Sequence, residues 1–206
     1  MSMRRWIAIA GGAALVAACN QAQPTRRAPD AMPLRYTPRN GVLVVNSGAL
    51  RELVVREAFT YVGGQRFILG GTADAEQHLF VVADSAKVVR QLYWIQIEEL
   101  LPGKGDAYDY SGDSTVAFSG FDLPANFRTY TTPAGAGSDR ARAFDYITAR
   151  GYAIPSGGTR VRLVHLPETP SRREVMVVYF ESSPRAATDP HASLLERAAS
   201  GLALRR

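Results

Sequence analysis

Cysteine, lysine and long hydrophobic runs are scarce in this chain of 206 residues. The only cysteine is Cys19, so no disulfide can form within the chain and the core alone must stabilise the fold. Lysine occurs only as Lys87 and Lys104, and the arginines are scattered. Nucleic-acid binding needs a concentrated basic patch, so a net charge of +5 with this distribution does not indicate it. No apolar run reaches the about 20 residues that a transmembrane helix needs.

The first residues have the layout of a secretory signal. Arg4 and Arg5 form a positive start, residues 6–18 carry no charge, and small residues precede Cys19. The run Val16-Ala17-Ala18-Cys19 resembles the lipobox of bacterial lipoproteins. That resemblance implies cleavage between Ala18 and Cys19 and a diacylglyceryl group on the Cys19 sulfur.

A lipidated Cys19 would hold the protein on a membrane without a transmembrane helix, because two or more acyl chains give stable attachment. The expected location is the bacterial cell envelope. Aspartate after the cysteine resembles an inner-membrane retention signal, and Asn20 stands there instead. We therefore expect the outer membrane, with the protein facing the periplasm.

Composition divides the chain into four parts. Residues 1–18 are the expected signal peptide, and residues 19–40 are the lipidated cysteine and a tether. Four prolines fall within this tether and favour extended chain over helix or sheet. Residues 41–183 are the expected globular domain, and residues 184–206 a linker with a C-terminal amphipathic helix.

Apolar runs bounded by turn residues predict strands. The expected strands lie at 42–45, 53–62, 66–71, 78–84, 87–101, 114–121, 127–132, 159–167 and 173–182. Gly63-Gly64 is expected to end one of them, and the last two are expected to form a hairpin. Residues 173–182 are apolar on both faces, which predicts a central strand. Within 87–101, Tyr93, Ile95 and Ile97 share an apolar face, whereas Trp94, Gln96 and Glu98 share a mixed one.

Two helices are expected. Residues 139–150 follow the capping residues Ser138 and Asp139 and precede Gly151, and residues 190–203 follow the Asp189-Pro190 start signal. The overall prediction is an α+β fold with a mainly antiparallel sheet of about six to eight strands. The stretches "GYAIP", "RLVHLPE" and "MVVYFES" are similar to a C-terminal pattern of uncharacterised proteobacterial proteins, a resemblance that implies no activity.

Two constellations could carry chemistry. His165 on one strand of the expected hairpin, with Tyr179 and Glu181 on the other, could do acid–base work. A structural histidine beside a carboxylate is the alternative interpretation.

The loop "DAYDYSGDS" alternates Asp109, Ser111 and Asp113 as calcium ligands do. However, its glycine falls one place early, and Gly120 stands where a closing acidic residue is needed. A polar turn is the alternative interpretation of this loop.

The sequence has no nucleophile elbow and no phosphate-binding loop, and its three histidines lack zinc spacing. The predicted function is therefore a non-catalytic binding or accessory domain of an envelope lipoprotein, without a cofactor. Its partners would be the membrane, through Cys19, and another envelope protein. The alternatives are an apolar or lipidic ligand site that uses Tyr93, Trp94, His165 or Tyr179, and a hydrolase built on the His165 or Asp109 region.

Overall fold

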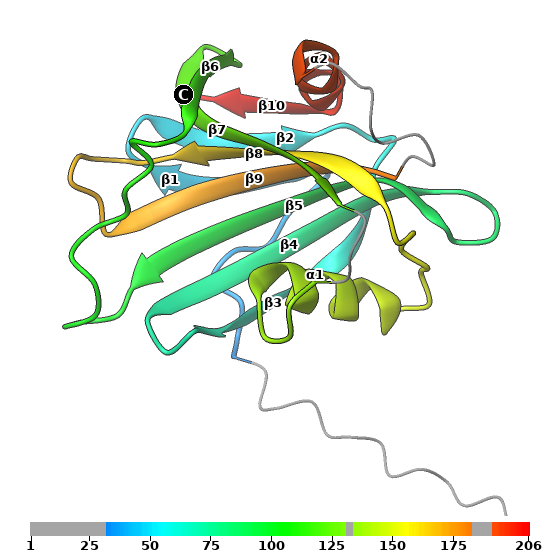
Figure 1. The fold of residues 1–206 in the computed structure, drawn as a ribbon, viewed down its shortest axis with the longest axis horizontal. Helices are drawn as coiled ribbons and strands as arrows, with labels where there is room; N and C mark the ends of the chain where they lie inside the picture. The colour runs from blue at the N-terminus through cyan, green and yellow to red at the C-terminus, as the bar shows by residue number, and fades with distance from the viewer. Residues whose placement is uncertain (1–31, 131–133, 183–190) are drawn as a thin grey trace, which may run out of the picture. The chain divides into compact units, whose positions relative to one another are not determined.

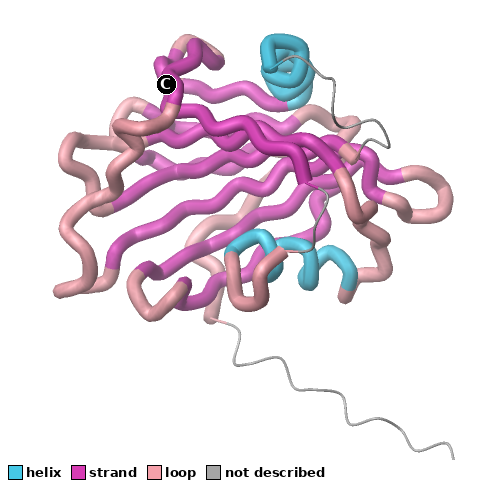
Figure 2. The backbone as a smooth tube through the Cα atoms, in the orientation of Figure 1, coloured by secondary structure: helices cyan, strands magenta, loops and turns pink. Residues whose placement is uncertain are grey.

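Ten strands and two helices make up the part of the chain that this computed structural model describes, residues 32–130, 134–182 and 191–206 (Figures 1 and 2). The strands are β1 (Val42–Ser47), β2 (Leu50–Val55), β3 (Thr60–Leu69), β4 (Ala73–Ala83), β5 (Val89–Leu100), β6 (Ser114–Phe118), β7 (Phe121–Tyr130), β8 (Gly158–His165), β9 (Arg173–Glu181) and β10 (Leu202–Arg205). The helices are α1 (Asp139–Thr148) and α2 (His191–Gly201).

The strands form two sheets with only antiparallel pairing between neighbours. The larger sheet has seven strands in the order β3-β4-β5-β9-β8-β7-β6, and the smaller has three in the order β1-β2-β10. The prediction of a mainly antiparallel sheet with two helices is confirmed, and the seven strands of the larger sheet lie within the predicted six to eight. The second sheet of three strands was not predicted. Strand β9 lies fourth of seven, as its two apolar faces predicted, and it pairs with β8 in the expected hairpin.

The seven-stranded sheet buries apolar side chains on both faces. On one face, Tyr93, Ile95 and Val177 pack with residues of the small sheet and of α2. On the other, Trp94 and Phe180 pack against α1. Figure 1 shows α1 in front of the large sheet, across β3 and β4, and β1 and β2 behind it. The alternation in β5 therefore separates two cores, with its mixed face toward α1.

The structure differs from the expectation around Gly63 and Gly64, which lie inside β3 and do not end a strand. The predicted strand 53–62 is divided between β2 and β3, and β3 pairs with β4. Tyr146 of α1 donates a hydrogen bond to the Gly64 carbonyl at 2.7 Å. A Cβ at Gly63 would lie 2.5 Å from the Tyr146 hydroxyl, so glycine here permits close helix packing.

Both helices begin and end close to the predicted positions. Ser138 caps α1 by accepting from the Ala141 amide, and Ala143 and Ile147 are the buried stripe. The second helix ends at Gly201, and residues 202–205 form β10 against β2, so the prediction of helix to residue 203 was wrong. The sequence alone predicts that the helix continues through these residues, because their alternating burial arises only once β2 lies beside them. The predicted Asp189-Pro190 start signal lies outside the described residues.

Candidate functional site

The proposed acid–base trio is not assembled. In the antiparallel register of β8 and β9, His165 lies opposite Val175, whereas Tyr179 lies opposite Val161. His165 is buried, its Nε2 lies 2.8 Å from the Ser47 carbonyl oxygen, and burial lowers its pKa. Pairing of the two strands was predicted correctly, but the register places the histidine at the far end from Tyr179. His165 is a structural residue that joins β8 to β1.

Two of the predicted ligand-binding tyrosines are core residues. The rings of Tyr93 and Tyr179 lie 5.0 Å apart, and burial raises the pKa of both hydroxyls. Tyr93 donates to the Ala198 carbonyl of α2, and Tyr179 donates to Glu181 at 2.5 Å. Glu181 is in turn paired with Arg197 of α2 at 2.8 Å. These tyrosines hold α2 on the sheet.

The polar side chains of the loop Asp109, Ser111 and Asp113 form contacts within the protein and do not converge on a metal site. Asp109 accepts from the Ser111 amide at 2.8 Å in a turn, and Asp113 forms an ion pair with Arg162 at 2.6 Å. Among the described residues, no three acidic, histidine or cysteine side chains are grouped to hold a metal ion. The turn interpretation fits these contacts, and the calcium interpretation lacks its ligands.

Two predicted site residues line cavities: Asp113 lines an open recess beside β6 and β7, and Trp94 lines a recess on the α1 side of the large sheet. The cavity at Trp94 has a volume of about 320 Å³ and lies between the start of α1 and the mixed face of the large sheet. Its lining comes from β5, β7, β8, β9 and the α1 start: Trp94, Tyr130, Gly135, Ser138, Asp139, Arg140, Arg160, Arg162, Met176 and Val178. We call it the arginine cavity.

The arginines of this cavity are held by aromatic rings and by one carboxylate. Arg140 lies 4.0 Å from the centre of the Tyr130 ring, and Arg160 lies 5.6 Å from the same ring. Arg162 lies 5.0 Å from the Tyr110 ring and is paired with Asp113. The Nε atoms of Arg160 and Arg162 are buried without a hydrogen-bond partner in the described structure. Burial lowers the pKa of Arg160, which marks a guanidinium removed from water.

Two buried glutamates lie on the same sheet face. Glu98 of β5 and Glu174 of β9 are register partners, and each is almost fully buried. Tyr108 donates to Glu98 at 3.0 Å, and Tyr110 donates to Glu174 at 2.5 Å. Burial, and then the neighbouring Glu98 charge, raise the pKa of Glu174 to about 7. Burial also raises the pKa of Glu98, so the pair retains a proton near neutral pH.

A row of amides connects this pair to α1. Gln65 donates to Gln77 at 2.7 Å, and Gln77 donates to Gln96 at 2.5 Å and to the Asp139 carbonyl at 3.0 Å. Gln96 accepts from the Trp94 indole at 2.7 Å and donates to Glu98. The network therefore fixes the Trp94 ring and the start of α1 on the sheet, which makes the arginine cavity a preformed feature.

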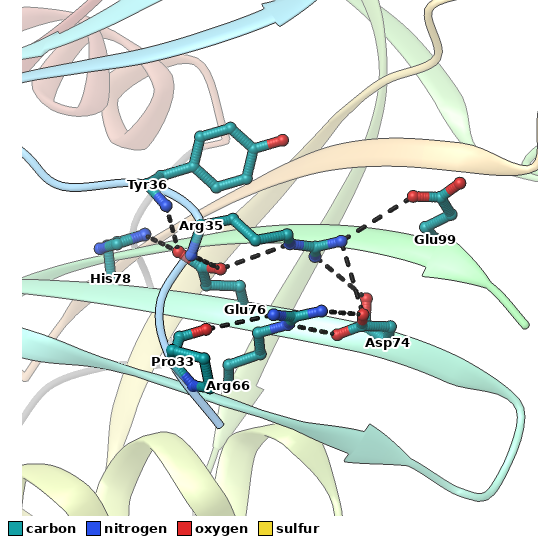
Figure 3. Close-up of polar contacts among 8 residues, drawn as sticks. All are labelled: Pro33, Arg35, Tyr36, Arg66, Asp74, Glu76, His78 and Glu99. Carbon is teal, nitrogen blue, oxygen red and sulfur yellow. Dashed lines mark hydrogen bonds and ion pairs between the residues drawn. The ribbon is translucent and has the colours of Figure 1, made fainter. Parts of the chain in front are cut away.

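A second polar cluster lies on the opposite face of the sheet and binds the chain before β1 (Figure 3). Buried Glu76 accepts from the Arg35 amide at 2.8 Å, the Tyr36 amide at 2.9 Å and His78 at 3.0 Å. Burial raises the pKa of Glu76, but these hydrogen bonds outweigh it and leave the pKa below its ordinary value. Arg66 donates to the Pro33 carbonyl at 3.1 Å.

This second cluster shortens the predicted tether. Residues 19–40 were assigned to it, yet residues 33–36 are bound to β3 and β4. The earlier part of the tether, together with Cys19, lies outside the described residues. The extended conformation predicted from the prolines suits this binding, because it leaves backbone amides available to the Glu76 carboxylate.

Sequence reasoning missed the arginine cavity as a site. Its signal was present in the stretch "TRVRLV", where alternation puts Arg160 and Arg162 on one face of an apolar strand. Comparisons with protein-family models, with curated proteins and with solved structures give no match. The geometry described above is therefore the basis for assigning a function.

Proposed function

We propose that this chain is a lipid-anchored envelope lipoprotein that holds a non-catalytic α+β binding domain at a membrane surface, on the periplasmic side of the outer membrane. The lipobox resemblance of Val16-Ala17-Ala18-Cys19 supports the anchor. In the described part of the chain, neither helix has the length and hydrophobicity to cross a bilayer. Attachment through a lipid on Cys19 needs no such helix.

The bound segment before β1 supports a short, defined connection to the membrane. The hydrogen bonds of Glu76 and Arg66 fix the chain from Pro33 onward. Residues 19–32 would then connect the lipid to the domain. Fully extended, these 14 residues span about 45 Å at about 3.3 Å each. The domain would work within that distance of the bilayer surface.

The arginine cavity is the single observation that carries the binding role. It is a recess with convergent polar donors and an apolar floor, the usual composition of a ligand site. The acid–base alternative at His165 loses its support, because the register separates that histidine from Tyr179. A binding domain therefore accounts for the described geometry better than a hydrolase does.

Replacement of Cys19 tests the anchor. The wild-type chain should fractionate with membranes and start at Cys19 with the added mass of acyl groups. The Cys19→Ser chain lacks the sulfur that accepts the lipid, so it should leave the membrane fraction. A Ser200→Ala chain, changed at an exposed hydroxyl of α2, is the matched control and should remain with the membranes. An unmodified Cys19, or membrane attachment unchanged by Cys19→Ser, would contradict the proposal.

A further inference from the structure

We propose that the arginine cavity binds a small organic anion: a carboxylate or phosphate group attached to a compact apolar or aromatic body. This names a ligand class for the proposed binding function. It does not depend on the lipid anchor, so the two proposals can fail separately.

The charge of the lining favours an anion. Three arginines and one aspartate line the cavity, an excess of two positive charges. The aspartate, Asp139, uses its Oδ1 to accept from the Arg140 amide at 2.7 Å. Asp113, outside the lining, neutralises Arg162. Because Asp113 neutralises Arg162, anion binding here depends mainly on the positive charge of Arg160.

Arg160 gives the strongest indication of a missing ligand. It has no carboxylate within ion-pair distance among the described residues, whereas Arg162 on the same strand pairs with Asp113 at 2.6 Å. Its Nε is buried without a hydrogen-bond partner. A partly buried guanidinium is costly when its donors are unpaired, and a bidentate oxyanion satisfies this geometry best. The Tyr130 ring holds the arginine at the cavity edge.

The start of α1 adds to the positive electrostatic potential of the cavity, but its backbone amides are not the main hydrogen-bond donors for an anion. The Ala141 amide is bound by the Ser138 hydroxyl at 3.2 Å, and the Arg140 amide is bound by Asp139. The helix dipole still favours negative charge at this end. Recognition would thus depend on the guanidinium groups, which the helix and β8 bring to the same recess.

The floor of the cavity specifies an apolar body. Trp94, Met176 and Val178 form it, and a small adjoining recess is lined by Leu92, Phe144 and Phe180. The volume of about 320 Å³ is at the lower end for ligand sites, which selects small molecules. A ring lying against Trp94, with its anionic group toward Arg160, fits both halves of the lining.

Trp94 gives a direct test. The chain has two tryptophans, and Trp6 lies in the proposed signal peptide. A Trp6→Phe protein purified in detergent therefore reports only on Trp94, whether or not the signal peptide has been removed. We would titrate its fluorescence with benzoate, with benzyl alcohol as the neutral match, and with inorganic phosphate. Short-chain phosphatidylglycerol and phosphatidylcholine below their micelle concentrations distinguish a lipid headgroup from a free anion as the source.

The expected result is a saturable change with benzoate, or with phosphatidylglycerol if the source is a lipid, and much weaker effects of the neutral counterparts. Arg160→Gln should weaken binding by about tenfold or more, since a charged hydrogen bond is lost. Arg160→Lys, which keeps the positive charge, should restore part of the lost affinity. Arg205→Gln is the matched control, because Arg205 is exposed and pairs with Glu52 on the other sheet, 3.6 Å away.

Two outcomes would overturn the proposal. One is no saturable response to any of the anions. The other is binding of benzyl alcohol as tight as benzoate, with no effect of Arg160→Gln, which would make the cavity purely apolar. If melting curves show that Arg160→Gln does not fold, Arg140→Gln on α1 replaces it under the same criteria. Failure here with Cys19-dependent anchoring intact removes the ligand class and leaves the lipoprotein.

Discussion

The buried carboxylate of Glu174 should make the stability of the protein fall as pH rises. It lies beside Glu98 on the register of β5 and β9 and accepts from Tyr110. The perturbation is Glu174→Gln, which keeps the size and an acceptor for Tyr110 but cannot ionise. Any effect of the substitution that depends on pH then reports the charge and not the packing.

The magnitude follows from the pKa. Burial raises the pKa of Glu174 from about 4.5 in an unfolded chain to about 7 in the folded protein. The folded state therefore binds the proton more tightly, and this stabilisation is complete below pH 4.5 and is lost by about pH 7. This difference between the two pKa values corresponds to about 3 kcal/mol in the free energy of unfolding. Relative to wild type, Glu174→Gln should gain that amount between about pH 4.5 and pH 8.

Urea unfolding at a series of pH values measures this difference directly. The exposed Glu57→Gln variant is the control for loss of a negative charge, and its difference from wild type should change little with pH. The reasoning is refuted if the difference between Glu174→Gln and wild type is the same at pH 4.5 and pH 8. A difference that grows in the opposite direction would show that the folded protein prefers the ionised carboxylate.

Two further predictions concern other parts of the domain. Glu76→Gln weakens the charged hydrogen bonds that hold residues 33–36, each of which is worth about 1.5–3 kcal/mol. Trypsin should therefore cut after Arg35 about tenfold faster than in the wild type. An unchanged cleavage rate would contradict this role of Glu76. Gly201→Ala places a methyl group 2.6 Å from the buried Tyr93 hydroxyl and should cost about 1–3 kcal/mol of unfolding free energy. Gly112→Ala, where a Cβ meets nothing within 4 Å, is its control, and equal melting temperatures for the two variants would argue against the overpacking.

Local patterns in the sequence were sufficient where each element depends on its own residues. The capping residue Ser138 and the end signal Gly151 predicted α1, and the apolar faces of β9 predicted its central place. The alternation in β5 also predicted a mixed face, where Trp94 and Glu98 now lie. These features depend on hydrogen bonds and side-chain periods within a few residues, so they can be derived without knowing the fold.

The site itself depended on the tertiary structure. Strand β10 forms because β2 offers it an edge, although its residues continue a helical pattern. His165 is separated from Tyr179 by a register that only the paired strands define. Glu98 and Glu174 become neighbours because β5 pairs with β9, far along the chain, and Arg160 becomes a cavity residue because α1 closes over it. The sequence by itself determined both helices, most of the strands and the lipobox resemblance at Cys19. Which charges face one another was decided by strand order and register, because these depend on many weak contacts between residues far apart in the chain.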